Sequence, residues 1–428
     1  MTGDTYPFAA NGRPVGNYLL ADESTRPRFG GVVGGAITAG TEPAILVIGA
    51  GFTGLSAALH LAELRRASGL PARILLVEQA RVASGPSGKS AGHICGLQAP
   101  DEDVRRHCGP ELGDRLIAAA DDASKLVRTL IERLAIPCDL RDGYVVVGSD
   151  GRQTVTEGGS AFGIDSYPYA LGLAHAAANL GVEIHEGVTV TRLERMSNGY
   201  LATTSGGPVQ VSHVLASGGH RMAEMIALLA PLRRRTTELV VSTIITAALP
   251  DAVLNAAMPA AAGRRFPFAN DSADVAYGSI DREGRLVFGA CATAWGMPDP
   301  ARIVQVLARL LPSLLPDYRT ATGAELAWDL LVEGERICFT RELLPNVGAI
   351  AEHPNILYVQ ALGGHGIALG TLLGASAARK LWGLRTGGGA TDGLFDAFAA
   401  VPHGWLPPWQ PWRSWTAGLG LLLRRRSH

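Results

Sequence analysis

The stretch Ala44-Ile-Leu-Val-Ile-Gly-Ala-Gly-Phe-Thr-Gly54 decides the fold of this chain. Its first five residues form an unbroken apolar run, which is typical of a parallel strand buried on both faces. A helix is expected from about Phe52 to Arg66, because apolar residues recur on one face. Residues 68–71 break the helix, and a second strand is expected over Arg73–Glu78. This order of elements predicts a crossover in a parallel sheet.

The turn between the strand and the helix contains three glycines, and each has a physical role. Gly49 makes the tight turn, Gly51 lets the backbone approach a pyrophosphate, and Gly54 lets helix and strand pack closely. The helix begins at Phe52 and Thr53, where free N–H groups and a partial positive charge face the phosphates. A Gly-x-Gly-x-x-Gly motif in this context predicts a site for an adenine dinucleotide.

An acidic residue ends the second strand, as such a site requires. Glu78 is expected to accept hydrogen bonds from a ribose diol, with Gln79 beside it. A carboxylate at this point disfavours a 2′-phosphate, and therefore NADP as the ligand. The motif alone does not separate FAD from NAD, and an ordinary glycine turn followed by an exposed glutamate is the alternative.

A family resemblance indicates FAD rather than NAD. Ile45–His60, followed by Ser84-Gly-Pro-Ser-Gly-Lys-Ser-Ala-Gly92, resembles the D-amino acid oxidase and glycine oxidase superfamily, and within it the gamma-glutamylputrescine oxidase branch. That branch often has Ser-Gly-Arg-Asn-Gly-Gly where this chain has Ser87-Gly-Lys-Ser-Ala-Gly92. In the superfamily this loop lies against the flavin ring. The resemblance therefore implies FAD as the cofactor, with contacts from Ser87, Gly88, Lys89, Ser90, Ala91, Gly92 and His93.

Four later segments are similar to the same superfamily. Asn355–Gly370 has its strand, Gly-His-Gly turn and glycine-bearing helix, which implies that Gly364, His365, Gly366 and Ile367 approach the pyrimidine end of the flavin. A helix N-terminus there can stabilise negative charge on the reduced flavin. Gly187–Glu194 and Val214–Gly219 imply adenine contact near Val188 and a pyrophosphate passing Ala216, Ser217 and Gly218. The segment Phe395–His403 is similar to the tail of the gamma-glutamylputrescine oxidase branch.

The resemblance implies oxidation of a C–N bond in a small amine or amino acid. A hydride would pass from the α-carbon to flavin N5 to give an imine, and oxygen, the expected acceptor, would yield hydrogen peroxide. Sarcosine oxidases use a lysine over the flavin to activate oxygen, but this chain has no lysine between Lys125 and Lys380. An FAD dehydrogenase passing electrons to a quinone or carrier, or a flavoprotein subunit of a larger complex, therefore remain alternatives.

Two residues are catalytic candidates. Arg336 lies in the Gly-x-Arg position where amino acid oxidases clamp the substrate carboxylate, a task that suits a guanidinium fork. The alternative for Arg336 is an ion pair, with Glu333 or Glu335 as partner. His365 is the second candidate, and its alternative is a turn histidine that serves packing. His93 and Lys89 have similar structural alternatives.

The expected fold is α/β, with a Rossmann-type FAD-binding domain and a discontinuous second α+β substrate domain built on an antiparallel sheet. Strands over 239–247 and 285–290 indicate that second sheet, and residues 301–315 are expected to be helical. The expected division is an arm at 1–43, an FAD-binding domain at 44–100, 160–225 and 331–385, a substrate-binding domain at 101–159 and 226–330, and a tail at 386–428.

Composition narrows the function classes. With 47% hydrophobic and 18% charged residues and a net charge of −1, the chain is globular, and no nucleic-acid partner is expected. Five scattered cysteines without a Cys-x-x-Cys pair argue against a disulfide framework and a zinc site. No secretory signal or long apolar run is found, so a cytoplasmic location is expected. The Trp- and Arg-rich tail could lie on a membrane surface, but docking onto its own domain or a partner subunit is the expectation.

Overall fold

The computed structural model describes residues 29, 32–33, 36–38, 40 and 42–406, apart from 98, 149, 151, 220, 262–263, 271–275, 282–283, 294–329 and 389–391. The helix expected over 301–315 lies outside the described residues. The same holds for most of the N-terminal arm and for the tail beyond residue 406.

The larger sheet begins with the predicted crossover. β2 (Ala44–Ile48), α1 (Phe52–Ser68) and β3 (Ile74–Glu78) follow one another, and β2 pairs with β3 in parallel. Within the described residues the order is β1-β8-β3-β2-β11-β10-β9, with β18 beside β11 and β17 beside β18. The other strands are β1 (Val32–Val33), β8 (Glu183–Glu186), β9 (Val190–Met196), β10 (Gly199–Thr204), β11 (Gly207–Ala216), β17 (Asn346–Ile350) and β18 (His353–Gln360). The parallel centre, β8-β3-β2-β11-β18, brings five carboxyl ends to one edge.

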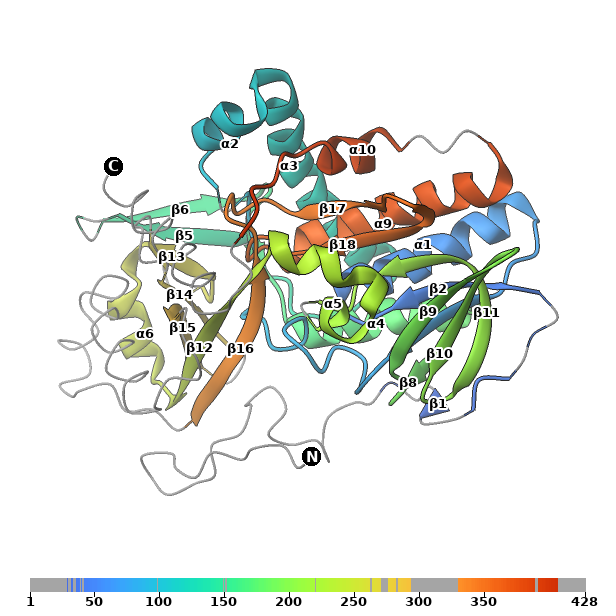
Figure 1. Ribbon diagram of the computed structural model, residues 1–428. Helices are drawn as coiled ribbons and strands as arrows, with labels where there is room; N and C mark the ends of the chain where they lie inside the picture. The colour runs from blue at the N-terminus through green and yellow to red at the C-terminus, as the bar shows by residue number, and fades with distance from the viewer. Residues whose placement is uncertain are drawn as a thin grey trace.

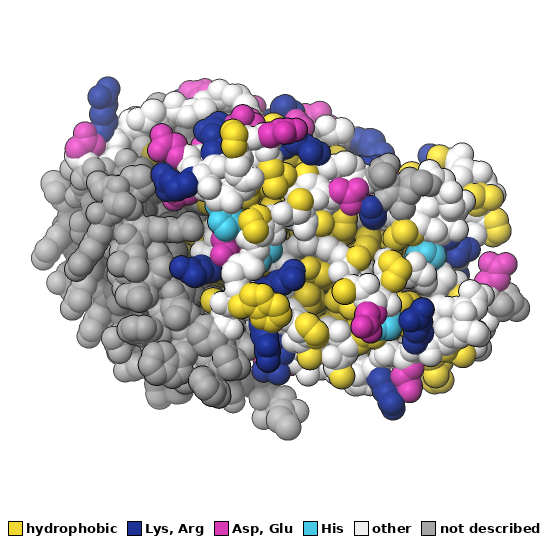
Figure 2. All heavy atoms as spheres, turned by 45° about the horizontal axis from the view of Figure 1, so that its top comes forward, with side chains coloured by type: hydrophobic (Ala, Val, Ile, Leu, Met, Phe, Trp, Pro, Cys, Tyr) yellow, Lys and Arg dark blue, Asp and Glu magenta, His cyan; other side chains and the backbone are white. Residues whose placement is uncertain are grey.

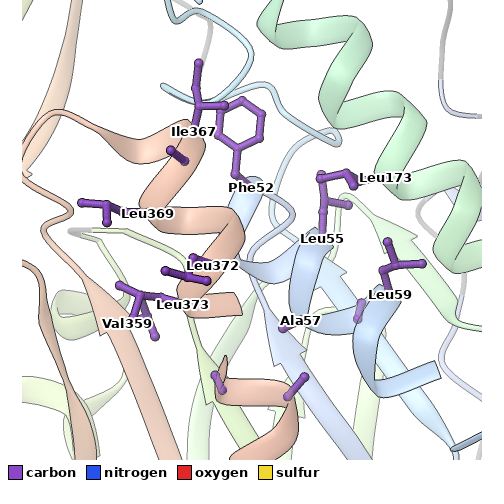
Figure 3. Packing of buried hydrophobic residues seen from close by; sticks show 14 of the residues in the cluster. Phe52, Leu55, Ala57, Leu59, Leu173, Val359, Ile367, Leu369, Leu372 and Leu373 are labelled. Carbon is purple, nitrogen blue, oxygen red and sulfur yellow. The ribbon is translucent and has the colours of Figure 1, made fainter. Parts of the chain in front are cut away.

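Helices cover one face of this sheet. α9 (Gly366–Thr386) lies directly on α1, because a Cβ at Gly374 would stand 2.3 Å from the carbonyl oxygen of Thr53. α3 (Pro110–Arg133) and α4 (Ser166–Asn179) complete this layer. Figure 3 shows Phe52 of α1 beside Ile367 of α9, and Leu55 of α1 beside Leu173 of α4. A second core lies on the opposite face, beneath α5 (Met222–Met225) and η1 (Ala227–Arg235).

The second sheet is the antiparallel sheet that was expected, and it lies to the left of the larger sheet in Figure 1. Its order within the described residues is β16-β12-β15-β14-β13-β5-β6, and only β13 and β5 pair in parallel. The strands are β5 (Gly143–Val147), β6 (Gln153–Glu157), β12 (Thr237–Ala248), β13 (Phe268–Asn270), β14 (Ala276–Ile280), β15 (Arg285–Thr293) and β16 (Leu330–Phe339). α6 (Asp251–Ala257) and η2 (Pro259–Ala261) follow β12.

One segment differs from its expected place. β16 pairs with β12 from Phe339 opposite Thr237 to Leu330 opposite Ile245, so residues 331–339 belong to the second sheet. They were expected in the FAD-binding domain. The reason is that β16 continues along β12 before the chain turns at Thr340 into β17. The other domain boundaries stay a prediction.

Short elements join the two sheets and cover the top of the molecule. β4 (His93–Ile94) pairs with β7 (Phe162–Gly163), α2 (Asp101–Cys108) precedes α3, and α10 (Gly393–Ala399) follows α9. The side chain of Asp392 caps α10 by accepting hydrogen bonds from two amides at its start. In the part of the chain that the structure describes, no helix has the length and apolar character to cross a membrane. On the face shown in Figure 2, basic and acidic side chains lie interspersed.

Candidate functional site

The first turn is closely packed at its three glycines, and two of them, Gly49 and Gly54, meet backbone atoms. The φ of Gly49 is +98°, and a Cβ there would lie 2.7 Å from the Cα of Gly218. A Cβ at Gly54 would lie 1.9 Å from the carbonyl oxygen of Gly49. A Cβ at Gly51 would lie 2.8 Å from the hydroxyl of Ser87. The structure therefore brings the glycine turn, the end of β11 and the 84–92 loop together.

The start of α1 faces this loop. Gly51 occupies the N-cap and has no side chain to satisfy the first amides. The amide of Phe52 donates a hydrogen bond of 3.3 Å to the hydroxyl of Ser87, and Thr53 is buried one residue later. Uncapped amides at a helix start bind phosphate oxygens well, because the helix dipole adds to their hydrogen bonds.

Glu78 lies at the end of β3 beside this turn. Its carboxylate accepts hydrogen bonds from the amides of Ala50, at 2.9 Å, and Ala80, at 3.0 Å. Burial raises the pKa of Glu78, although these amide bonds lower it in part. Gln79 is exposed beside it. The carboxylate is thus fixed at the carboxyl end of the sheet, where a ribose diol would meet it.

The next strand adds a second acid that the sequence reasoning missed. Glu186 ends β8 directly opposite Glu78 and is buried. Its carboxylate accepts a 2.7 Å hydrogen bond from the amide of Val82. The amide of Val188 bonds the carbonyl of Glu78 at 2.8 Å, so the expected adenine contact lies beside the expected ribose contact. The available signal was an acidic residue directly before Gly187, where a segment similar to the superfamily begins.

The end of β11 lies against the same turn. The amide and hydroxyl of Ser217 both donate to the carbonyl of Ile48, each at 2.9 Å. Ala216, the last residue of β11, pairs with Ile48 of β2 and is fully buried. These contacts place the 216–218 backbone beside Gly49.

The 84–93 loop is held in a single conformation by close backbone contacts. A Cβ at Gly88 would lie 2.1 Å from the carbonyl oxygen of Ala83, and one at Gly92 would lie 1.7 Å from that of Ile164. The carbonyl of Ser90 accepts a 2.8 Å hydrogen bond from Ser166. Lys89 is partly buried in the same loop, and Ala91 packs against Ile245 and Val287 of the second sheet. The loop therefore lies between the two sheets.

The start of α9 approaches this loop from the other side. Gly364 has a φ of +87°, His365 occupies the N-cap without a side-chain cap for the helix, and Gly366 and Ile367 form the first turn. The Nδ1 atom of His365 lies 3.4 Å from the Sγ of Cys95, two residues beyond His93. Burial lowers the pKa of His365 to about 4, so its ring is uncharged at neutral pH.

His93 faces the second sheet. Its Nδ1 lies 3.0 Å from the hydroxyl of Tyr144 on β5, and its ring meets those of Tyr144 and Tyr277 edge-on. Tyr144 also hydrogen-bonds Cys95. Burial, and secondly the charge of Arg141, lower the pKa of His93 to about 3. Both histidines are therefore neutral, and Cys95 and Tyr144 join them in one hydrogen-bonded network.

Cys95, Tyr144 and Tyr277 were not among the predicted site residues. Tyr144 lies on β5, and nothing in the spacing of the sequence shows which way its side chain faces. Burial raises the pKa of Cys95 to about 11, so it is a thiol and not a reactive thiolate.

Arg336 lies on β16 and has a partner within the chain. Its Nη1 atom lies 2.9 Å from the Oε2 of Glu238 on β12, and 46% of its side chain is exposed. An ion pair, which the sequence allowed as the alternative, is therefore present, and its partner lies on the neighbouring strand β12. A substrate carboxylate would have to share or replace Glu238 as the partner of this guanidinium.

Comparison with known protein families shows to which family the chain belongs. The model of the DAO family, "FAD dependent oxidoreductase", matches residues 44–161 and 157–380. The chain belongs to this family. The predicted superfamily, the oxidoreductase class and FAD as the cofactor are thereby confirmed, and the two-domain α/β fold agrees with them.

Similar proteins of this family cover most of the chain. Gamma-glutamylputrescine oxidoreductase of Escherichia coli is 23% identical, over 84% of this chain and 86% of its own length. The structure of glycine oxidase from Geobacillus kaustophilus has a TM-score of 0.59 at 18% identity, covering 77% of this chain and 92% of its own. L-proline dehydrogenase from P. horikoshii has a TM-score of 0.61 at 14% identity, covering 82% and 95%. The two structures share the fold.

The Gly49–Gly54 turn, Glu78 and the 84–93 loop together form a cradle, and its residues fit the family's cofactor. The bare Cα of Gly51 leaves space beside Ser87 that a Cβ would fill, and the Glu78 carboxylate is held beside the turn by the amide of Ala50. The starts of α1 and α9 both lack a side-chain cap. We therefore propose that the Gly49–Gly54 turn holds the diphosphate and that the flavin ring lies between the 87–93 loop and the 364–367 turn.

Proposed function

We propose that the protein oxidises a C–N bond of an amine or amino acid and passes the electrons to oxygen, releasing hydrogen peroxide. Bound FAD supplies the hydride acceptor. The observation that carries the proposal is the meeting of the 87–93 loop, the 364–367 turn and the second sheet, joined by the His365–Cys95 and His93–Tyr144 contacts. The similar proteins named above act on C–N bonds by their names, which supports the reaction class.

The chain's own residues favour an uncharged amine at this place. His93, His365, Cys95 and Tyr144 are all neutral at pH 7, because burial lowers the pKa values of the histidines and raises those of the thiol and the phenol. A desolvated, neutral wall disfavours an ammonium group. Hydride transfer requires the neutral amine, so the wall supports binding of the reactive form. Its role is to orient the substrate and exclude water.

The electron acceptor separates the proposal from its main alternative. No lysine occurs between Lys125 and Lys380, so a lysine from that region is not available to activate oxygen. A dehydrogenase that passes electrons to a quinone or carrier is therefore the second candidate, and the likeness to a proline dehydrogenase fold is compatible with it. A subunit whose role is assembly is the third, and turnover by the purified single chain would exclude it as the only role.

The test has two halves. The purified protein is mixed anaerobically with a panel of primary and secondary amines and amino acids, and the flavin absorbance is followed. Bleaching by a member of the panel, then oxygen uptake with stoichiometric peroxide, supports the oxidase. Bleaching that a quinone reverses rapidly, with slow oxygen uptake, selects the dehydrogenase. Reduction by 2-hydroxy acids or NADH, with none by the amines, contradicts the proposed C–N chemistry.

A further inference from the structure

The segment after α10 returns to the core through one buried histidine. His403 is almost fully buried and lies between two oxygen atoms. Its Nδ1 is 3.2 Å from the Oε2 of Glu342, and its Nε2 is 3.0 Å from the carbonyl oxygen of Pro345. The amide of Gly404 donates to the other carboxylate oxygen of Glu342 at 3.2 Å. The C-terminal segment is thus fastened to the 340–345 turn at both ends of that turn.

Both partners of His403 are oxygen atoms that accept hydrogen bonds. Burial by itself would raise the pKa of Glu342, but the bonds from His403 and Gly404 lower it overall, so the carboxylate is ionised. A buried carboxylate is costly unless it is hydrogen-bonded. His403 and the amide of Gly404 supply those bonds, one to each carboxylate oxygen.

The turn that this pair clamps is strained. Leu343, next to Glu342, has a φ of +60°, which is a left-handed conformation that a branched side chain disfavours. The hydroxyl of Thr340 bonds both the amide and the carbonyl of Leu344, at 3.1 and 2.7 Å, and closes the turn. Strained backbone of this kind is unfavourable by itself and persists only when its surroundings hold it.

The strained turn in turn supports the start of α9. A Cβ at Gly363 would lie 2.4 Å from the carbonyl oxygen of Leu343, so the two backbones are in direct contact. Gly363 has a φ of +64°, and Ala361, another left-handed residue at +54°, lies two positions earlier. Gly364 and His365 follow immediately. A continuous path of contacts therefore leads from His403 to the turn assigned to the flavin.

We propose that His403 is a positioning residue for FAD, which holds the 340–345 turn and, through Gly363, the backbone that receives the flavin. His403 supports the binding of the cofactor and not the binding of the substrate. This inference concerns FAD retention, and it stands whether or not the substrate is an amine.

Other charged and titratable groups meet this region from each neighbouring element. His107 at the end of α2 contacts the carbonyl of Pro402 through Nε2 at 2.6 Å. The pKa of Cys108 is raised by burial and, secondly, by the negative charge of Glu342. The stem of Arg341 approaches Gly404. Arg234 of η1 bonds the amide of Leu406 through its carbonyl and places its guanidinium over the ring of Trp405. Among these groups, His403 alone contacts both Glu342 and Pro345.

The test compares His403→Gln with a matched control. The amide side chain of this variant keeps a donor but cannot contact both oxygens as the two ring nitrogens do. His353→Gln removes another histidine tether, the 3.2 Å contact with Tyr200 at the opposite end of β18 from the flavin turn. FAD affinity is measured by titrating the apoprotein with FAD and following flavin fluorescence, and thermal melting of the apoprotein is recorded alongside.

We expect His403→Gln to weaken FAD affinity about tenfold or more, whereas His353→Gln stays within about twofold at a comparable loss of melting temperature. Equal FAD affinity in the two variants overturns the proposal. Should His403→Gln fail to fold, Glu342→Gln tests the same contact from its other partner, and it must also weaken FAD affinity about tenfold or more. An FAD affinity of Glu342→Gln equal to that of the wild type also overturns the proposal.

Discussion

At the scale of single residues, the Gly49–Gly54 turn depends on glycine, which has no Cβ and so lets a cofactor come close to the backbone. Gly51 leaves open the space that a Cβ would occupy 2.8 Å from the Ser87 hydroxyl. Gly85, in the same loop as Ser87, has open space around its own Cβ position. The two glycines therefore form a matched pair for testing the diphosphate site.

We predict that Gly51→Ala lowers FAD affinity about tenfold or more, which corresponds to roughly 1.4 kcal/mol, and that Gly85→Ala leaves it nearly unchanged. The added methyl group of the first variant stands between the backbone and the diphosphate. Flavin content after purification, together with an FAD titration, measures the effect. Full FAD occupancy in Gly51→Ala would place the diphosphate elsewhere.

The hydroxyl of Tyr144 contacts both His93 and Cys95, and Cys95 in turn contacts His365. Tyr144 and Cys95 thus connect the two histidines of the site. We predict that Tyr144→Phe slows anaerobic flavin reduction at least tenfold without loss of bound FAD, because His93 loses the contact that fixes its ring. The matched control is Tyr200→Phe, which removes a hydroxyl contact to His353 outside the site. Each change leaves a buried or half-buried partner unpaired, at a cost of about 1–3 kcal/mol. Stopped-flow reduction rates that are equal in the two variants would remove Tyr144 from the site.

Acid stability follows from the same buried ring. The pKa of His93 falls from about 6.5 in an unfolded chain to about 3 in the fold, because burial and Arg141 disfavour its charged form. The unfolded state therefore binds more protons below about pH 6.5, and stability is lost progressively as the pH falls from there toward 3. We predict that His93→Gln reduces the loss in unfolding free energy between about pH 7 and pH 5, measured in urea. If His93→Gln loses as much unfolding free energy over this pH range as the wild type, the lowered pKa of His93 is contradicted.

The Arg336–Glu238 pair is the residue-scale test of carboxylate recognition. We predict that Arg336→Ala weakens binding of amino acid substrates far more than it alters the flavin spectrum, whereas simple amines are unaffected. Glu238→Gln is the companion variant, because it frees the guanidinium and should strengthen carboxylate binding. Equal affinity for a carboxylate substrate before and after Arg336→Ala would exclude Arg336 from the site.

At the scale of elements, the close contact of α1 and α9 sets the position of both helix starts. A Cβ at Gly374 would lie 2.3 Å from the carbonyl of Thr53, so an added methyl group must separate the helices. We predict that Gly374→Ala destabilises the fold by about 1–3 kcal/mol and weakens FAD binding with it. Gly388→Ala, just beyond α9 with its nearest neighbour at 3.5 Å, should do neither. Thermal melting of both variants decides.

The elements that the sequence predicted are those with local signals. β2, α1 and β3 carry their own apolar patterns and glycines, and their predicted bounds agree with the structure to within a few residues. The two-residue strands β4 and β7 carry no such pattern, because only their mutual pairing makes them strands. β16 was placed with the wrong sheet for a related reason: its partner, β12, is about ninety residues away, and hydrogen bonding rather than sequence order assigns it.

At the scale of the whole molecule, the site lies where two sheets meet, and this explains which residues could be foreseen. The cradle residues were predictable, because their motifs carry a physical reason and a family resemblance. The link between Cys95 and His365 joins positions 270 residues apart, so no spacing reveals it. The roles of Tyr144, Tyr277 and Glu186 likewise depend on the packing of one sheet against the other or of one strand on the next.

The most direct test of the account is anaerobic reduction of the bound flavin by one amine in two isotopic forms. We predict that the amine bleaches the flavin absorbance of the purified protein, and that deuterium on the carbon next to nitrogen slows the bleaching, because that C–H bond breaks as its hydride leaves. A bound flavin that amines and amino acids leave oxidised, while a 2-hydroxy acid or NADH reduces it, would contradict the account.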